Sequence, residues 1–189
     1  GGGTSGVMAA IQSARMGVKT VLVEEGPWLG GMLTAAGVSA IDGNHELPSG
    51  LWGEFRAELE NHYGGAKELA TGWVSNTQFE PSVGAKILRE MAAKEKALVV
   101  MLETRRTEVM QTTRGWIVTL LDKTGHKIYV KSAVLIDATE LGDVAAKTVG
   151  IRYDVGMDSR DSTGEAAAPP KANDIVQDLT YAAILKDYG

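Results

Sequence analysis

The first 17 residues constrain the fold more than any other part of the chain. Glycines occupy the three positions of a G-x-G-x-x-G pattern, as Gly1, Gly3 and Gly6. Over residues 5–16, apolar residues recur at the three- and four-residue spacing of one helix face. Gly17 follows, where a glycine commonly ends a helix. The segment therefore predicts a glycine-rich turn that leads into an amphipathic helix.

The residues after this helix predict a strand that ends in an acid. Residues 19–23 form a short, mostly apolar run, and Glu24 follows it directly. A glycine-rich turn, a helix, a strand and an acid in this order are typical of a dinucleotide-binding βαβ unit, here without its first strand. The alternatives are a tag remnant, or a glycine-rich turn before an ordinary helix with Glu24 as a solvated acid.

Each position of such a unit has a physical reason. A pyrophosphate needs backbone N–H groups at the N-terminus of a helix, where the helix dipole favours negative charge. Side chains at Gly1 and Gly3 would block that approach or the turn before it, whereas Gly6 lets the helix pack close to the sheet. The carboxylate of Glu24 would accept hydrogen bonds from a ribose diol. It would also repel a 2′-phosphate, which disfavours NADP.

A glycine pair follows the acid, and here the sequence resembles a known family. Residues 26–34 have the sequence GPWLGGMLT. Residues 1–34 resemble the N-terminal part of FAD-dependent oxidoreductases of the glutathione-reductase-like flavoprotein class. The similarity is greatest to the bacterial family that has Leu-Gly-Gly-Met-x-Thr after the ribose-binding acid. The alternative interpretation of Leu29, Gly30 and Gly31 is a helix cap or a turn, which would be preferred if no acid preceded them.

The resemblance implies FAD as the cofactor and an α/β fold. The fold would be an FAD-binding, Rossmann-type three-layer fold, with a parallel sheet, an inserted antiparallel β-meander and no first strand. In this class the Gly-Gly segment passes close to the flavin side of the pyrophosphate, so Gly30 and Gly31 would permit close backbone approach. Met32 and Thr34 would lie near the ribityl chain and the flavin ring.

The remaining pattern fits this architecture. Helices are predicted over residues 51–63 and 81–94, and the apolar run 97–102 predicts a strand buried on both faces of a parallel sheet. A second buried strand is predicted at 133–136. Short antiparallel strands are predicted between these two, over residues 104–110, 114–121 and 126–133. We expect four parts: residues 1–35 (dinucleotide-binding βαβ portion), 36–96 (helical and loop insertion), 97–150 (sheet and meander that complete the FAD domain) and 151–189 (start of a substrate domain, or a linker, with a helix from 173 to 186).

Later residues add expected contacts with the cofactor. The last strand of the class usually continues into Ala-Thr-Gly, and here Ala138 and Thr139 match while Glu140 replaces the glycine. Asp143 would bond a flavin-side hydroxyl, or would be an acid at a helix N-terminus. The adenine contact of the class falls at Arg106, through its main chain, unless this is an exposed strand arginine. The predicted cofactor-binding residues are Gly1, Gly3, Thr4, Ser5, Gly6, Glu24, Glu25, Gly30, Gly31, Met32, Thr34, Arg106, Ala138, Thr139 and Asp143.

Composition narrows the chemistry. The chain has no cysteine, which excludes disulfides, thiolate metal sites, dithiol redox chemistry and a cysteinyl-flavin link within this segment. The formal net charge is −5 and no basic cluster occurs, so nucleic acid is a poor partner. No apolar run is long enough to span a membrane. No metal-ligand constellation is visible in the sequence.

We therefore expect the FAD-binding part of an oxidoreductase that transfers a hydride or electrons between FAD and an organic small molecule. The alternatives are a nucleotide-binding module without chemistry of its own and an NAD-binding dehydrogenase domain. His45, in the loop after the flavin-side motif, is a candidate acid or base, although a lone loop histidine is more often solvated. The substrate, the oligomeric state and the compartment stay open, with a slight preference for the cytoplasm.

The glycine-rich turn also leads to an expectation about the chain as a whole. The strand that should precede Gly1 is the central strand of such a sheet, and a domain without it would expose two buried edges. We therefore expect a fragment of a longer flavoprotein, truncated at both ends, which binds FAD weakly, if at all. Tight, stoichiometric FAD on residues 1–189 would contradict this expectation.

Overall fold

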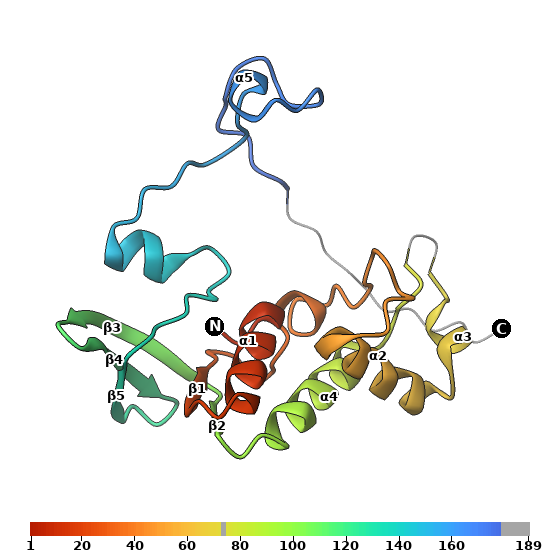
Figure 1. Cartoon of the computed structure of the whole chain (residues 1–189), viewed down its shortest axis with the longest axis horizontal. Helices are drawn as coiled ribbons and strands as arrows, with labels where there is room; N and C mark the ends of the chain where they lie inside the picture. Colours follow the sequence, from red (N-terminus) through yellow and green to blue (C-terminus); the bar gives the residue numbers. More distant parts are fainter. Residues whose placement is uncertain (73–74, 179–189) are drawn as a thin grey trace.

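The computed structural model describes residues 1–72 and 75–178 of the chain (Figure 1). The strands form a parallel pair, β1 with β2, and an antiparallel sheet in the order β3-β4-β5, which confirms the predicted α/β class with its meander. The helices and strands, in chain order, are α1 (Thr4–Arg15), β1 (Thr20–Val23), the 3₁₀ helix η1 (Gly31–Leu33), α2 (Gly50–Tyr63), α3 (Ala66–Leu69), α4 (Pro81–Ala93), β2 (Leu98–Met101), β3 (Thr104–Thr112), β4 (Gly115–Asp122), β5 (Lys127–Ser132), the π-helical segment η2 (Ala145–Val149) and α5 (Arg160–Thr163).

The core lies between the parallel pair and the helices. Leu22 of β1 is opposite Val100 of β2, and both belong to the apolar cluster that α1, α2 and α4 contribute to. Helix α1 supplies side chains from the face that the sequence periodicity predicts. The buried residues of this apolar cluster are Val7, Ala10, Ile11, Leu22, Leu29, Phe55, Leu59, Leu69, Phe79, Ile87, Leu88, Met91 and Ala92.

The other face of the parallel pair is open. Val21 and Val99 are opposite each other in the register, and they are 40% and 57% exposed. The prediction that residues 97–102 are buried on both faces is therefore wrong. The reason is that α1 and α4 pack on the Leu22 face, so that side chains at alternate positions of β1 and β2 meet solvent.

Helix α1 ends as its glycine predicts. Gly17 has a left-handed backbone conformation, with φ +83°. Its N–H donates to Ala14 O (2.9 Å), and the N–H of Val18 donates to Ser13 O (3.1 Å). These two hydrogen bonds form a Schellman motif, which satisfies carbonyls at the end of the helix and turns the chain toward β1.

The segment between η1 and α4 closes over the core through backbone pairing and aromatic contact. The N–H of Ile41 donates to Thr77 O (2.9 Å), and the N–H of Phe79 donates to Ser39 O (3.2 Å). Phe55 of α2 meets Phe79 edge-on, with ring centroids 5.6 Å apart. Helices α2 and α4 match the predictions for 51–63 and 81–94 within one residue. The four-residue α3 was not predicted because its segment has no apolar period.

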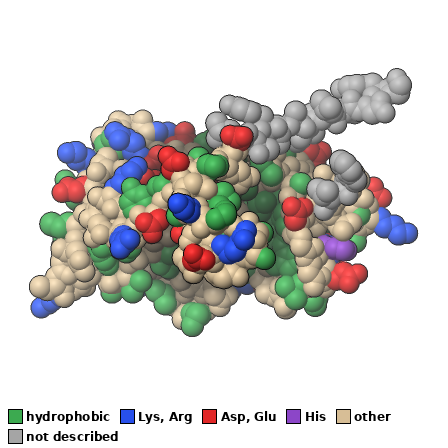
Figure 2. Space-filling view, turned by 90° about the horizontal axis from the view of Figure 1, so that it is seen from above, with side chains coloured by type: hydrophobic (Ala, Val, Ile, Leu, Met, Phe, Trp, Pro, Cys, Tyr) green, Lys and Arg blue, Asp and Glu red, His purple; other side chains and the backbone are tan. Residues whose placement is uncertain are grey.

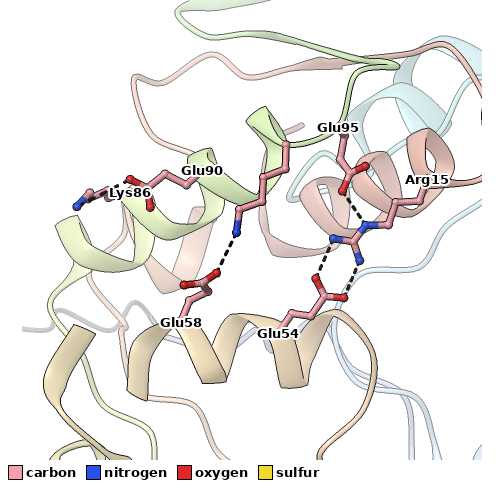
Figure 3. A network of polar contacts seen from close by, with 7 residues as sticks. Arg15, Glu54, Glu58, Lys86, Glu90 and Glu95 are labelled. Atoms are coloured by element: carbon pink, nitrogen blue, oxygen red, sulfur yellow. Dashed lines mark hydrogen bonds and ion pairs between the residues drawn. The ribbon is translucent and has the colours of Figure 1, made fainter. Parts of the chain in front are cut away.

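Charged side chains join α1, α2 and α4 at the surface (Figure 3). Arg15 pairs with Glu54 (Nη1–Oε1 2.6 Å) and with Glu95 (Nε–Oε1 2.7 Å). The hydrogen bonds from Arg15 hold the pKa of the Glu54 carboxyl below its usual range. Lys94 and Glu58 form a second link between α4 and α2 (2.9 Å). Exposed pairs contribute only about 0.2–1 kcal/mol each, so this network mainly fixes how the three helices are oriented.

The first strand of the meander, β3, begins beside the end of β1 in space. The N–H of Thr104 donates to Glu24 O (3.0 Å), which places the start of β3 beside the last residue before the turn. A bulge interrupts β3 between Arg106 and Glu108, where the register to β4 shifts. The strands predicted at 104–110, 114–121 and 126–133 are confirmed as β3, β4 and β5, with shifts of at most two residues at their ends.

Residues 133–136 do not form the predicted buried strand. Val134 and Ile136 are 74% and 58% exposed. A strand needs a neighbouring backbone that completes its hydrogen bonds, and no segment of the described chain pairs with these residues. The apolar run correctly indicates β-propensity, but a pairing partner decides whether a strand forms.

Beyond residue 150 the chain leaves the body of the molecule, and the segment around α5 lies apart from it (Figure 1). A helix was predicted to begin at Asn173. Instead, Asn173 pairs with Met157 in an antiparallel bridge, and its side chain accepts the N–H of Ile175 (3.0 Å). This local turn replaces the first helical turn, and residues 173–178 are not helical. The rest of the predicted helix lies outside the described residues.

Two further features concern the charges on the surface and the length of the helices. On the face shown in Figure 2, Lys and Arg side chains are interspersed with Asp and Glu, so that neither charge dominates that face. None of the helices in residues 1–72 and 75–178 is both long and apolar enough to cross a membrane.

Candidate dinucleotide-binding site

Segments far apart in the sequence meet at the N-terminus of α1. The N–H of Gly30 donates to Gly2 O (2.8 Å), and the hydroxyl of Thr4 donates to Gly30 O (2.9 Å). The turn after β1 therefore lies against the glycine-rich turn. The segment after the meander also reaches this turn, since Ala138 lies beside Gly1 and Gly6.

Two of the patterned glycines are required by close backbone packing. A Cβ at Gly6 would lie 2.0 Å from Gly1 O and 3.0 Å from Ala138 Cβ. A Cβ at Gly1 would lie 2.3 Å from Ala138 O. Real Cβ atoms do not approach backbone oxygens so closely, so only glycine permits these crossings. The close contact of α1 with the neighbouring backbone is therefore built on Gly1 and Gly6.

Gly3 differs from the other two glycines. A Cβ at Gly3 would meet nothing within 4 Å, and its φ of −60° and ψ of 173° are open to any residue. Packing therefore gives no reason for a glycine here. In the first turn of α1, the N–H groups of Ser5 and Gly6 find no acceptor within the described residues. Open space and free donors at a helix N-terminus are what an anionic group needs.

Glu24 is fixed in place by two backbone donors. The N–H of Gly2 donates to Oε2 and the N–H of Gly26 donates to Oε1, both at 2.7 Å. A carboxylate oxygen accepts more than one hydrogen bond, so both oxygens keep capacity for a diol. Gly2 also has no room for a side chain, because its Cβ would lie 2.8 Å from Glu24 Cβ. The sequence pattern missed Gly2 and Gly26, since neither is a defined position of G-x-G-x-x-G.

The glycine pair after Glu24 adopts conformations that favour glycine. Gly30 has φ +112° and Gly31 has φ +53°. A Cβ at Gly31 would lie 3.0 Å from Gly3 Cα, so the pair lies directly against the glycine-rich turn. Thr34 is 1% exposed, and its hydroxyl donates to Leu29 O (2.7 Å). In this structure the Thr34 side chain closes the turn that positions the two glycines.

Other predicted site residues are less constrained. Met32 is 59% exposed, and Glu25 is exposed and lines an open pocket of about 390 Å³ between the end of β1 and the meander. Arg106 is half-buried beside the bulge of β3. His45 is half-buried, and its carbonyl accepts from the guanidinium of Arg56 on α2. The roles predicted from the sequence for these four residues stay predictions.

Asp137, which the sequence reasoning did not single out, organises the third segment. Its Oδ1 accepts the N–H (2.9 Å) and the hydroxyl (2.7 Å) of Thr139, and its Oδ2 accepts the N–H of Ala145 (2.8 Å). Burial alone would raise the pKa of Asp137, but these hydrogen bonds outweigh it and hold the pKa below its usual range. The carboxylate is therefore ionised at neutral pH.

The residues that follow form a short helical segment. Asp143 is at its start, its N–H donates to the Thr139 hydroxyl (2.7 Å), and its carboxylate pairs with Lys147. This position favours the helix-terminal role over a bond to a flavin-side hydroxyl. Glu140, which replaces the usual glycine, has no positive φ, and Gly142 has φ +67° instead. The replacement of the usual glycine by Glu140 therefore introduces no left-handed strain in this chain.

The structure thus gathers most of the predicted cofactor-binding residues around one helix N-terminus. Contacts within this group fix the backbone, while the space beside one glycine stays open. Within the described ranges, no group of three or more His, Asp or Glu side chains could hold a metal ion. The gathered residues are Gly1, Gly3, Thr4, Ser5, Gly6, Glu24, Gly30, Gly31, Ala138 and Thr139.

Comparison with known proteins supplies a family. A family model described as "FAD dependent oxidoreductase" matches residues 1–188. Among solved structures, a flavoprotein/dehydrogenase from Cytophaga hutchinsonii is similar with a TM-score of 0.61 and 18% identity, covering 82% of this chain and 42% of that one. An L-proline dehydrogenase from P. horikoshii has a TM-score of 0.40 and 19% identity, covering 68% and 19%. A search of the curated proteins finds no match. The chain spans less than half the length of the flavoprotein/dehydrogenase, whose similarity shows a shared Rossmann-type fold.

Proposed function

The chain belongs to the family of FAD-dependent oxidoreductases, whose cofactor is FAD, and on this premise we propose that residues 1–150 bind FAD for a reaction with a small organic substrate. When bound, FAD supplies the redox chemistry, as acceptor or donor of a hydride or electrons. The protein itself binds and orients the FAD. The observation that carries the proposal is the open space at Gly3 beside free N–H groups.

The N-terminus of α1 fits the diphosphate of FAD. The N–H groups of Ser5 and Gly6 are free donors, and the dipole of a 12-residue helix favours negative charge at this end. The absence of a Cβ at Gly3 leaves the room that a phosphate would fill. Favourable donors and space at one point support a diphosphate better than an ordinary helix start.

Glu24 suits the adenosine ribose. Its two backbone hydrogen bonds, from Gly2 and Gly26, hold the carboxylate in one orientation before any ligand binds. Preorganised acceptors lose little freedom when a hydroxyl arrives, which increases affinity. The same negative charge would oppose the 2′-phosphate of NADP. These features support the predicted ribose contact.

The other predicted contacts are assigned to the two ends of the cofactor. We place the backbone of Gly30, Gly31 and Ala138 on the flavin side and the main chain of Arg106 near the adenine. Membership of the family favours FAD over the alternative of an NAD-binding dehydrogenase domain. The hydroxyl of Thr139 is already used inside its own segment, so its contact with FAD would also be through the backbone. His45 remains the candidate acid or base.

A titration of the chain with FAD, followed by flavin fluorescence, tests the proposal. We expect a saturable change that ADP reverses by competition, because ADP shares the adenosine and diphosphate of FAD. NADP should compete far less, since its 2′-phosphate meets the Glu24 carboxylate. If refolded protein leaves the flavin fluorescence unchanged at saturating FAD, residues 1–150 do not form an FAD site.

A non-catalytic module would pass the same titration, so a second measurement separates the two functions. FAD bound to the protein should be reduced by a small organic donor that leaves free FAD oxidised under the same conditions, which the loss of flavin absorbance reports. Bound FAD that no donor of a small-molecule panel reduces faster than free FAD would favour the non-catalytic alternative.

A further inference from the structure

Within the described residues, the same hydrogen-bonded turn occurs at two places. In each copy, an Asp side chain accepts the N–H and the hydroxyl of the Thr two residues later. The distances are 2.8 and 2.7 Å from Asp122 to Thr124, and 2.9 and 2.7 Å from Asp137 to Thr139. Each carboxylate also accepts a more distant backbone N–H, at 2.9 and 2.8 Å respectively. The local chemistry of the two turns is therefore matched.

The surroundings of the two turns differ. Asp122 is the last residue of β4, directly before the turn to β5, and exposed residues follow it. Asp137 lies next to Ala138, whose carbonyl oxygen and Cβ are the atoms that a side chain at Gly1 or Gly6 would strike. Only the second turn is in contact with the glycine-rich turn. A shift of that turn would change the position of Ala138 against the start of α1.

Asp137 directly precedes Ala138, and its carboxylate fixes the residues that follow Ala138. The carboxylate bonds Thr139, directly after Ala138, and Ala145, at the start of η2. The Thr139 hydroxyl in turn accepts the N–H of Asp143 (2.7 Å). Residues 137–145 are thus joined by one carboxylate, and no strand pairing fixes the segment before them in the described chain. Among the described residues, the backbone of Ala138 itself makes no hydrogen bond, so its position depends on these neighbouring bonds.

We propose that Asp137 is a positioning residue of the cofactor site, which holds the backbone of Ala138 against Gly1 and Gly6. It does not touch the cofactor. It sets the separation between the glycine-rich turn and the segment that faces it, and hence the space for the dinucleotide. The inference rests on the proposed binding of FAD and adds a residue that the family pattern and the sequence reasoning did not assign.

The matched turn supplies the control. Asp137→Asn and Asp122→Asn each remove one carboxylate from the same Asp-x-Thr arrangement. We expect Asp137→Asn to weaken FAD affinity about tenfold, the equivalent of one charge-assisted hydrogen bond, and Asp122→Asn to change it less than about twofold. The flavin fluorescence at saturating FAD should also change only in Asp137→Asn, because a displaced Ala138 alters the surroundings of bound flavin. A merely structural role would lower the fraction of folded protein and leave this saturated signal unchanged.

Several outcomes are decisive. Equal FAD affinities for Asp137→Asn and Asp122→Asn, both folded, would overturn the inference and leave the proposed function intact. A wild-type chain that shows no saturable FAD signal would overturn both. If Asp137→Asn does not fold, Asp137→Glu replaces it, since it keeps the charge but displaces the carboxylate by one methylene. Wild-type affinity and wild-type saturated fluorescence in folded Asp137→Glu would likewise overturn the inference.

Discussion

Gly6→Val is expected to abolish measurable FAD binding and to lower the unfolding temperature. A Cβ at this position would lie 2.0 Å from the carbonyl oxygen of Gly1, which is backbone and has no rotamer to change. Helix α1 would have to move away from Gly1 and Ala138, and both lie in the candidate site. Overpacking of this kind typically costs about 1–3 kcal/mol, with backbone clashes at the upper end. Thermal unfolding and an FAD titration of the same preparation measure the two effects.

Gln12→Val is the matched control for this variant. Gln12 is on the exposed face of the same helix, so the substitution introduces the same β-branched residue without a clash. Its unfolding temperature and FAD affinity should stay close to those of the wild type. A Gly6→Val protein with the stability and affinity of the Gln12→Val protein would show that α1 does not pack as described.

Glu24→Ala should weaken FAD binding by one to two decades. The loss of a charge-assisted hydrogen bond to the ribose corresponds to ~1.5–3 kcal/mol of binding free energy. The variant also leaves the N–H groups of Gly2 and Gly26 without their acceptor, so some loss of stability should accompany the loss of affinity. Isothermal titration with FAD, at matched fractions of folded protein, gives the ratio of dissociation constants.

Glu108→Ala is the control that separates the loss of a negative charge from the loss of a hydrogen bond to the ribose. Glu108 is an exposed acid on β3, and its removal changes the net charge by the same amount. FAD affinity in this control should differ from wild type by less than about twofold, because screened surface charges contribute little at physiological salt. Equal effects of the two variants would remove the ribose contact from the account and leave only general electrostatics.

Much of the fold was predictable from sequence because its elements are specified locally. Helix α1 has its apolar face within 12 residues and its own glycine terminator at Gly17, so tertiary context had little to add. The meander has alternating strands and a turn of Asp, Thr and Gly between β4 and β5, which also act locally. Such signals determine both the type of element and its approximate ends.

The failed predictions involve partners or competing side chains. Residues 133–136 have the composition of a strand, but no described strand lies beside them. Val99 was expected to be buried because its neighbours are apolar, yet exposure depends on what covers that face of the sheet. At Asn173, a side chain expected to cap a helix instead closes a turn of its own. None of these outcomes is encoded in the periodicity of the segment itself.

The candidate site shows the same division. The glycine pattern and Glu24 were predictable because their chemistry depends on spacing along one βαβ unit. Asp137 was not, since its role depends on Ala138 meeting Gly1, a contact between opposite parts of the sequence. The Asp-x-Thr pattern was the available signal, because an Asp side chain often bonds the backbone two residues later. The pattern alone does not determine the turn, since Thr163 of the Asp161-Ser162-Thr163 segment bonds the carbonyl of Ser159 in α5 instead.

The central claim is that a diphosphate occupies the space beside Gly3, and Gly3→Ser tests it most directly. Serine is a good N-cap, and nothing lies within 4 Å of its Cβ position, so the free energy of unfolding should be unchanged or slightly raised. Its hydroxyl would fill the phosphate space and accept the N–H groups of the first turn, so FAD affinity should fall by about tenfold or more. The stability and the FAD affinity of Gly3→Ser, measured on one preparation, should therefore respond differently: the stability is kept and the affinity is lost. Unchanged FAD affinity in a stably folded Gly3→Ser protein would contradict the account.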